Sequence, residues 1–439
     1  MPQSPPNWYD LFRKLQEDGQ AQDLFRVPVG PVHREQYLHW DKLRRLDPPD
    51  GLTHEQWWVA LKFQRLGGTA IPLQSSDHRG FTFLLPDPVL RRLHRIDLSV
   101  GGSIEMPDQV TSPETRDRYI VNSLIEEAIT SSQLEGAVTT RAIAKEMIRT
   151  SRAPVDRSEQ MILNNYRTMR FIRTLKDKSL TPALVYEIQR CVTIDTLDDP
   201  TAAGRVRRAD ERVDVIDEYG EVFHLPPPAD ELEGRMIAMC DFANAQTPSA
   251  FVHPAVRSIL LHFWLAYDHP FLDGNGRTAR ALFYWSMLHH GYWLCEFISI
   301  SQIIKRAPSK YYRAFLHTET DDNDLTYFLL YHLEIMEKAV DQLHRYIREK
   351  MAGLKSLERE LRGIQYLNHR QRSVVSHAIR HPDGRYTIES HRISHDVVYE
   401  TARSDLHDLV DRNLLDARKS GRTWTFSPAH DLESKLRDG

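Results

Sequence analysis

The stretch from His269 to Arg280 restricts the fold more than any other part of this chain, because it links two apolar helical patterns through a glycine-rich turn. Gly274 and Gly276 flank Asn275, and glycines this close let the backbone turn its N–H groups inward as an anion-binding nest. The apolar periodicity resumes after Gly276, which predicts a helix there whose positive end faces the nest.

Charged side chains around this nest indicate what it binds. Arg277 and Arg280 stand three residues apart, on one face of the first helical turn. His269 comes before the nest and supplies an imidazole. The stretch therefore predicts a site for a chain of phosphates with a histidine beside it.

The composition is that of an ordinary globular protein. Of the 439 residues, 41% are hydrophobic and 27% are charged, and the net charge of −4 indicates no global attraction to nucleic acids or membranes. No apolar run is long enough to span a membrane, and the first residues lack the regions of a signal peptide. Cys191, Cys240 and Cys295 are scattered and indicate neither disulfides nor a metal site. We therefore expect a cytoplasmic protein with no membrane partner.

The pattern is mainly helical, and the length allows two or three domains. We predict a helical N-terminal subdomain over residues 1–105, with a short strand at 81–85. A central domain over residues 106–365 contains the glycine-rich turn. Residues 366–439 form a separate unit.

An isolated β-hairpin is predicted within the central domain, over residues 212–225. Apolar residues alternate on either side of the turn at 217–220, and the run of prolines at 226–228 ends the second strand. A two-stranded hairpin has an open edge that can accept an extended peptide as a third strand.

A glutamate stands at the end of the first predicted helix of the central domain. Gly136 has the place of a residue that ends a helix, and Thr140 offers a cap for the next one. This arrangement leaves Glu135 where the helix dipole disfavours a negative charge. Taken alone, Glu135 is a surface carboxylate, as most glutamates are.

The C-terminal part shows two further features. Residues 323–365 have a heptad-like apolar spacing, which predicts a long helix that acts as a spacer or a dimerisation element. The last 70 residues have the order helix, helix, helix and strand-turn-strand, typical of a winged helix-turn-helix. Ten Lys or Arg stand against eight Asp or Glu over residues 369–428, a weak electrostatic footprint for DNA. We therefore rank a protein contact or a homodimer above DNA binding.

The glycine-rich stretch resembles the signature of the Fic family, His-x-Phe-x-(Asp/Glu)-Gly-Asn-Gly-Arg-x-x-Arg, with every defined position filled. The resemblance extends over roughly residues 110 to 365 and implies a Fic helical bundle in which the hairpin serves as a flap. One departure is Asp268, where most members have an aliphatic residue.

This resemblance implies transfer of AMP from ATP to the hydroxyl of a Ser, Thr or Tyr on a target protein, or on the chain itself. His269 would be the general base, which suits an imidazole with a pKa of about 6.5. Asp273 would hold Mg²⁺. The phosphates would lie against the backbone and side chains of Gly274, Asn275, Gly276, Arg277 and Arg280, with Phe271 anchoring the loop.

The resemblance also implies roles for residues outside the motif. The flap would hold the target as an extended strand, and Val213 and Ile216 would border the nucleotide. Tyr311 and Tyr312 match a tyrosine pair that lies near the adenine in the family.

A second family signature lies upstream, since Ser131-x-x-x-Glu135-Gly136 matches the inhibitory motif (Ser/Thr)-x-x-x-Glu-(Gly/Asn). In such members the glutamate pairs with the arginine that matches Arg277 and obstructs the γ-phosphate. The resemblance therefore implies an autoinhibited enzyme with Ser131 and Glu135 as its inhibitory residues.

Two alternatives stay open at this point. One is a Fic protein that transfers another nucleotide or group, or that removes AMP with Glu135 positioning a water. The other is a DNA-binding regulator in which the Fic part senses a nucleotide.

Overall fold

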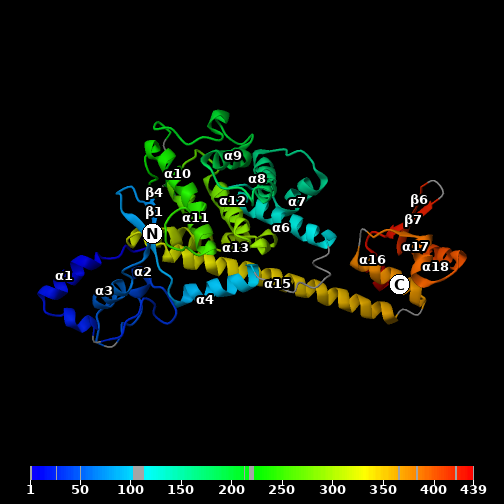
Figure 1. Cartoon of the computed structure of the whole chain (residues 1–439), viewed down its shortest axis with the longest axis horizontal. Coiled ribbons are helices and arrows are strands. Elements are labelled where there is room, and N and C mark those ends of the chain that lie inside the picture. The colour runs from blue at the N-terminus through cyan, green and yellow to red at the C-terminus, as the bar shows by residue number, and fades with distance from the viewer. Residues whose placement is uncertain are drawn as a thin grey trace. The chain divides into compact units, whose positions relative to one another are not determined.

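The computed structural model of the chain is mainly helical, as the sequence predicts (Figure 1). It describes residues 2–25, 27–49, 51–101, 113–211, 213–216, 222–363, 366–381, 384–420 and 423–438. The chain divides into two compact units. The larger unit comprises Met1–Ile104 and Tyr119–Asp341, and the smaller unit comprises Glu105–Arg118 and Gln342–Gly439. The domain boundaries predicted near residues 105 and 365 fall outside the described residues.

The first hundred residues form helices and a hairpin within the larger unit. Trp57 and Trp58 are fully buried in an apolar cluster there. The strand predicted at 81–85 is present as β2, and its antiparallel partner β1 was not predicted. The elements are α1 (Trp8–Glu17), α2 (Trp40–Leu43), α3 (His54–Gln64), β1 (Thr69–Gln74), β2 (Gly80–Phe83) and α4 (Asp87–Ile96), with short turns of other helix types at Ala21–Phe25 and Asp97–Gly101.

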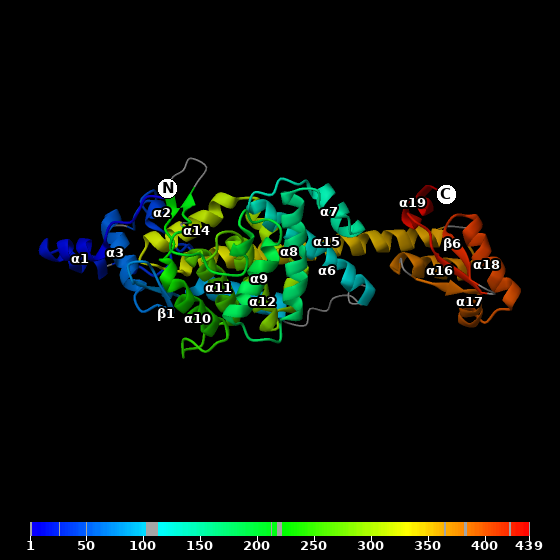
Figure 2. The same cartoon turned by 90° about the horizontal axis from the view of Figure 1, so that it is seen from above.

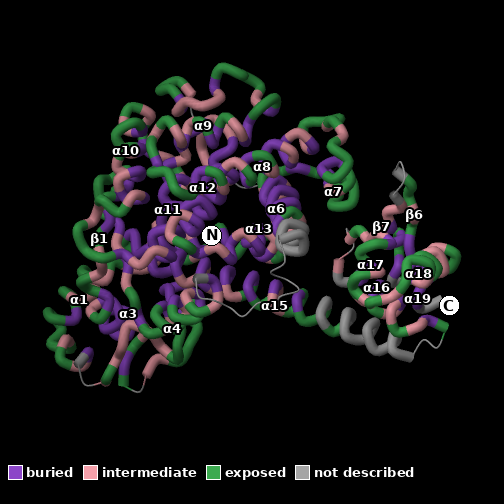
Figure 3. The backbone as a smooth tube through the Cα atoms, turned by 45° about the vertical axis from the view of Figure 1, so that its right-hand side comes forward, coloured by how far each residue is buried: buried purple, intermediate pink, exposed green. Residues whose placement is uncertain are grey.

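The rest of the larger unit is a bundle built around two helices, α11 (Pro254–Asp268) and α12 (Asn275–His289). They lie side by side in both views (Figure 1, Figure 2). Nearly all their residues are buried, the polar ones included, because other helices pack against both (Figure 3). The glycine-rich turn joins them, so the fold places the turn at the centre of the bundle.

Other helices surround this central pair. They are α6 (Pro113–Leu134), α7 (Arg141–Thr150), α8 (Arg157–Thr174), α9 (Pro182–Thr193), α10 (Leu232–Ala243), α13 (Ile300–Lys305), α14 (Pro308–Thr320) and α15 (Thr326–Gly363), with short 3₁₀ turns at Pro200–Ala202, Ala229–Glu231 and Trp293–Phe297. The helix ends predicted around Glu135 are confirmed: Gly136 has φ +93°, and the Thr140 side chain caps α7.

The predicted hairpin is present, with short strands. β3 (Val215–Ile216) pairs with β4 (Val222–His224) in antiparallel register, Val215 opposite His224. The turn predicted at 217–220 lies outside the described residues.

The smaller unit has its own core of apolar side chains, which includes Val375, Leu406 and Phe426. Its three-stranded antiparallel sheet has the order β5-β7-β6. The elements are α16 (His369–Arg380), β5 (Tyr386–Thr387), α17 (Ile388–His395), α18 (Tyr399–Asp411), β6 (Leu415–Ser420), β7 (Thr423–Pro428) and α19 (Leu432–Asp438). Three helices followed by a strand pair is the predicted order; a winged helix-turn-helix and its roles in DNA binding or dimerisation stay predictions.

Over the described parts of the chain, no helix has both the length and the apolar character that a membrane crossing requires.

Candidate active site

A cavity of about 860 Å³ opens beside the glycine-rich turn. Its wall is formed by the end of α6, the hairpin, the turn between α11 and α12, and α14. The predicted site residues that line it are Glu135, His269, Gly276, Arg280, Tyr311 and Tyr312. Residues more than 170 positions apart in sequence therefore meet in one space.

His269 lies at the mouth of the turn in a left-handed backbone conformation, with φ +43°. Its Nδ1 lies 3.3 Å from the carbonyl oxygen of Ala266, one turn back along α11. Nδ1 is therefore the protonated nitrogen, and Nε2 has no hydrogen-bond partner among the described residues.

Burial lowers the pKa of His269 to about 4, despite the contact with Ala266 and the charge of Glu135, which raise it. The nearby charges of His224 and Arg207 act in the same direction as burial and contribute to this lowered value. The imidazole is therefore neutral near pH 7, and Nε2 carries a free lone pair that can accept a proton.

The turn is held in shape by a reciprocal pair of hydrogen bonds. The Phe271 N–H donates to Asn275 Oδ1 at 2.9 Å, and Asn275 Nδ2 donates to the Phe271 carbonyl at 2.7 Å. The Phe271 ring is fully buried beneath. Arg207 holds the other side, since its backbone N–H donates to Pro270 at 2.8 Å and its Nε donates to the His269 carbonyl at 3.2 Å.

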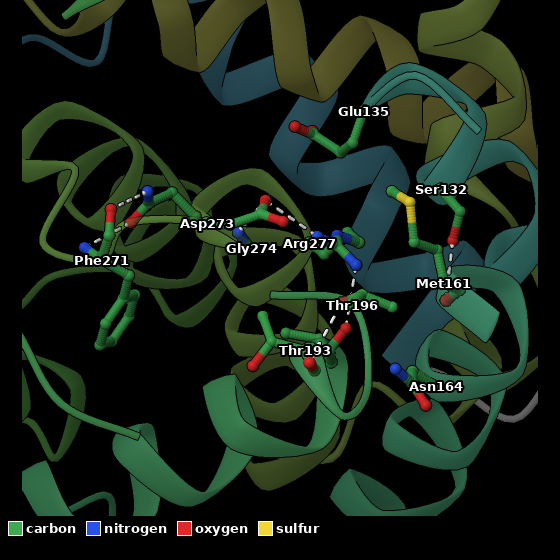
Figure 4. Close-up of polar contacts among 12 residues, drawn as sticks. Ser132, Glu135, Met161, Asn164, Thr193, Thr196, Phe271, Asp273, Gly274 and Arg277 are labelled. Carbon is green, nitrogen blue, oxygen red and sulfur yellow. Dashed lines mark hydrogen bonds and ion pairs between the residues drawn. The ribbon is translucent and has the colours of Figure 1, made fainter. Parts of the chain in front are cut away.

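Gly274 cannot be replaced without strain. It caps α12 with φ +83°, and a Cβ added there would lie 2.8 Å from Thr193 Cγ2. Gln189, also on α9, donates to the Asp273 carbonyl at 3.1 Å. The end of α9 is therefore packed directly against the turn (Figure 4). The helix begins at Asn275, one residue before Gly276 and earlier than predicted.

Arg277 and Asp273 form an ion pair on the α9 side of the turn (Figure 4). Arg277 Nη2 lies 3.0 Å from Asp273 Oδ1, and Nη1 donates to the Val192 carbonyl at 2.9 Å. The arginine is buried, and its Nε has no partner. Neither residue is among those that line the cavity.

Arg280 points the other way, toward α6. Its Nε donates to Ser131 Oγ at 2.8 Å, and its Nη2 donates to the Ser131 carbonyl at 3.0 Å and to Glu135 Oε1 at 2.8 Å. A Cβ added at Gly276 would collide with the Glu135 carboxylate. The carboxylate therefore rests on the first turn of α12, where the nest was predicted.

Residues 179–287, which include α9, the hairpin, α11 and most of α12, match the family model of the Fic/DOC family. Over this segment the chain is similar to the Fic/DOC family. The Protein adenylyltransferase Fic of Nematostella vectensis is 30% identical over 171 residues, 38% of each chain. That of Drosophila willistoni is 33% identical over 118 residues, 27% of this chain and 22% of the relative. The match thus spans well under half of these relatives.

Solved structures agree in fold. A Fic family protein from Desulfovibrio desulfuricans G20 superposes with a TM-score of 0.52 at 18% identity, over 79% of this chain and 98% of that one. Fic-1 from C. elegans gives 0.51 at 18% identity, over 79% of this chain and 90% of that one. At this identity the likeness concerns the fold alone.

The structure corrects one contact that the resemblance implied. Glu135 pairs with Arg280, and the expected pairing with Arg277 is wrong. The reason lies in helix geometry, because residues three apart differ by about 60° around the axis. That rotation directs Arg277 toward α9 and Arg280 toward α6.

Two other predicted residues are placed differently from expectation. The Asn275 amide is hydrogen-bonded to the backbone of Phe271. It therefore shapes the turn and does not face the cavity as a phosphate ligand. From the hairpin, Val215 lines the cavity and Val213 does not, while the side chain of Ile216 lies outside what the structure describes.

Asp268, the departure from the family pattern, is buried and paired. Arg235 Nη2 lies 2.6 Å from its Oδ1, and Trp264 Nε1 donates to Oδ2 at 2.9 Å. Burial raises the pKa of Asp268 and Arg235 opposes this. Arg235 also donates to the Gln74 carbonyl at 2.6 Å, which ties the start of the turn to β1.

Some functional contacts gave no sequence signal. Glu127 is buried on α6 and accepts hydrogen bonds from Tyr284, Ser299 and Ser301, so it anchors the helix that carries Glu135. Its place eight residues before Glu135 puts the two on neighbouring faces of one helix, but its partners lie more than 150 residues away.

Proposed function

We propose that this protein transfers AMP from ATP to the hydroxyl of a protein Ser, Thr or Tyr, and that Glu135 restrains the reaction. One observation carries the proposal. A single cavity joins the free Nε2 of His269, the first turn of α12 at Gly276, and the buried cation of Arg280. The relatives named adenylyltransferases support the choice of AMP.

The chemistry follows from these groups. His269 Nε2 takes the proton of the target hydroxyl while its oxygen attacks the α-phosphorus. The bond from the α-phosphorus to the bridging oxygen breaks, and pyrophosphate leaves with that electron pair. Arg280, together with the N–H groups at the start of α12, stabilises the negative charge on the phosphates.

Asp273 fits the expected part in Mg²⁺ binding. Its carboxylate is about one-third exposed; Arg277 holds one oxygen, and the exposed Arg157 lies 3.8 Å from the other. The described residues hold no cluster of three metal-ligating side chains, and one carboxylate is enough for Mg²⁺, which takes its other ligands from phosphates and water. The ion would neutralise charge on the phosphates.

Tyr311 and Tyr312 offer a wall for the nucleoside. Tyr311 is buried, and its hydroxyl lies 3.0 Å from His262 Nε2, while Tyr312 is 42% exposed. The hairpin, through Val215 and Phe223, borders the same cavity and would present the target as an added strand.

Glu135 supplies the restraint. Its carboxylate occupies the cationic end of the site, in contact with Arg280 and against Gly276. The carboxylate repels a phosphate group at this position and already occupies Arg280. ATP therefore cannot bind with its α-phosphate in line with the target hydroxyl.

Incubation with Mg²⁺ and ATP labelled at the α-phosphate tests the proposal. The wild type should label itself weakly, Glu135→Gly strongly, and Glu135→Gly with His269→Ala not at all. Glu146→Gly, an exposed glutamate on α7, is the matched control and should behave as wild type.

If the protein becomes labelled by ATP that carries its label on the γ-phosphate, it transfers phosphate, which contradicts AMP transfer. Preference for another labelled nucleotide would favour the alternative Fic activity. If the wild type releases AMP from labelled protein and Glu135→Gly does not, the result would favour an enzyme that removes AMP.

A further inference from the structure

A second cavity, of about 370 Å³, lies in the larger unit. Side chains of α2, α4, α14 and α15 form its wall. Its volume lies within the range of small-molecule sites, roughly 300–1,000 Å³. Arg313 alone is shared between the described linings of the two cavities.

Helix α14 contributes side chains to both cavities. Lys310, Arg313 and His317 repeat at helical spacing and line the second cavity. Tyr312, Leu316 and Glu319 lie on the adjacent face and line the first. A ligand on one side of α14 therefore touches the helix that also forms the nucleotide wall.

Three cations at the second cavity form no ion pair among the described residues: Lys42, Lys310 and Arg313. The charge of Lys310 reaches the Glu334 carboxylate and helps to lower its pKa. The other charged side chains at this cavity already form ion pairs. Glu35 pairs with Arg91 at 2.6 Å, and Arg92 and Glu334 pair with Glu337 and Lys338. The cavity therefore has an excess of positive charge.

Two polar atoms at this cavity lack any partner. His317 is only 7% exposed, and its Nε2 has no hydrogen bond. The Tyr331 hydroxyl is also buried and without a partner. Buried polar groups are nearly always hydrogen-bonded, so two orphans on one cavity indicate a missing ligand group.

We propose that this second cavity binds a phosphate monoester of a small molecule. Lys42, Lys310 and Arg313 neutralise the phosphate, and His317 and Tyr331 hydrogen-bond the ligand. The proposal does not rest on AMP transfer, because it concerns binding alone.

Calorimetric titration of the full chain tests it, with ribose 5-phosphate and inorganic phosphate as probes and ribose as the uncharged control. Ribose 5-phosphate should bind, and ribose should not. The double substitution Lys42→Ala and Lys310→Ala should weaken binding at least about tenfold. Tyr331→Phe, which keeps the ring, should weaken it about threefold.

Two controls separate this site from others. Lys178→Ala removes an exposed cation that lines neither cavity and should leave binding unchanged. Arg280→Ala alters only the first cavity and should also leave it unchanged. The proposal is overturned if no phosphate probe binds, if ribose 5-phosphate binds no better than inorganic phosphate, or if Arg280→Ala removes binding while the lysine substitutions do not.

Discussion

Glu135 Oε1 lies 2.8 Å from Arg280 Nη2, and Arg277 forms its own ion pair with Asp273 on the opposite side of the turn. The two arginines of the signature therefore have separate tasks in this state. Arg280 is bound to the end of α6, whereas Arg277 holds the turn against α9.

This difference predicts that, of the two arginines, only Arg280 restrains the end of α6. Arg280→Ala removes the bonds to Ser131 and Glu135, so amide hydrogen exchange over residues 131–136 should become roughly tenfold faster. Arg277→Ala leaves those bonds in place and should not change exchange there. Equal acceleration in both variants would mean that the turn as a whole, and not Arg280, holds the helix.

The lowered pKa of His269 predicts the pH profile of labelling. The neutral imidazole is the reactive base, and with a pKa of about 4 it is neutral at any higher pH. The rate for Glu135→Gly should therefore be nearly constant from about pH 5.5 to 8, whereas an unperturbed histidine would lose half its activity near 6.5. A midpoint close to that value would show that burial does not lower the pKa.

Glu127 should control both stability and restraint. It is 1% exposed and accepts hydrogen bonds from Tyr284 at 2.9 Å, from Ser299 at 2.7 Å and from the Ser301 N–H at 3.1 Å. Glu127→Ala leaves these donors unpaired, so the free energy of unfolding should fall by about 3 kcal/mol. Self-labelling should rise, because α6 no longer holds Glu135 in place.

Urea unfolding and the labelling assay measure these two effects, with Glu146→Ala as the exposed control. Destabilisation without any gain in labelling would show that Glu127 supports the fold but not the restraint.

His224 should make the hairpin sensitive to pH. Its Nε2 lies 2.6 Å from the Tyr267 carbonyl and its Nδ1 lies 2.7 Å from Glu319, so only the protonated ring donates to both. Burial lowers the pKa of His224, but the hydrogen bond and charge of Glu319 outweigh burial and raise it. The stabilisation is therefore complete below the unfolded pKa of about 6.5 and is lost as pH rises through the folded value.

Hydrogen exchange of residues 222–225, corrected for the intrinsic effect of pH, measures this loss. Protection should fall as pH rises in the wild type. It should change much less in Glu319→Gln, which removes the charge. The same pH dependence in both proteins would exclude this ion pair as the cause.

Local features of the backbone could be predicted from the sequence without knowledge of the fold. Gly274 falls where the backbone needs a left-handed conformation, and Gly136 and Thr140 mark a helix end and a helix start. The alternation over residues 212–225 indicated the hairpin. These features depend on residues close in sequence, whose steric and hydrogen-bonding preferences act over a few positions.

The sequence by itself thus determined that a helical domain carries a glycine-rich turn with His269 beside it, and the motif around Glu135 predicted a restraint. Only the tertiary structure decided that Arg280 is the partner of Glu135, that Asn275 fastens Phe271, and that α14 contributes side chains to two cavities. Side-chain direction around a helix and packing between distant helices fix those contacts, and no local pattern records them.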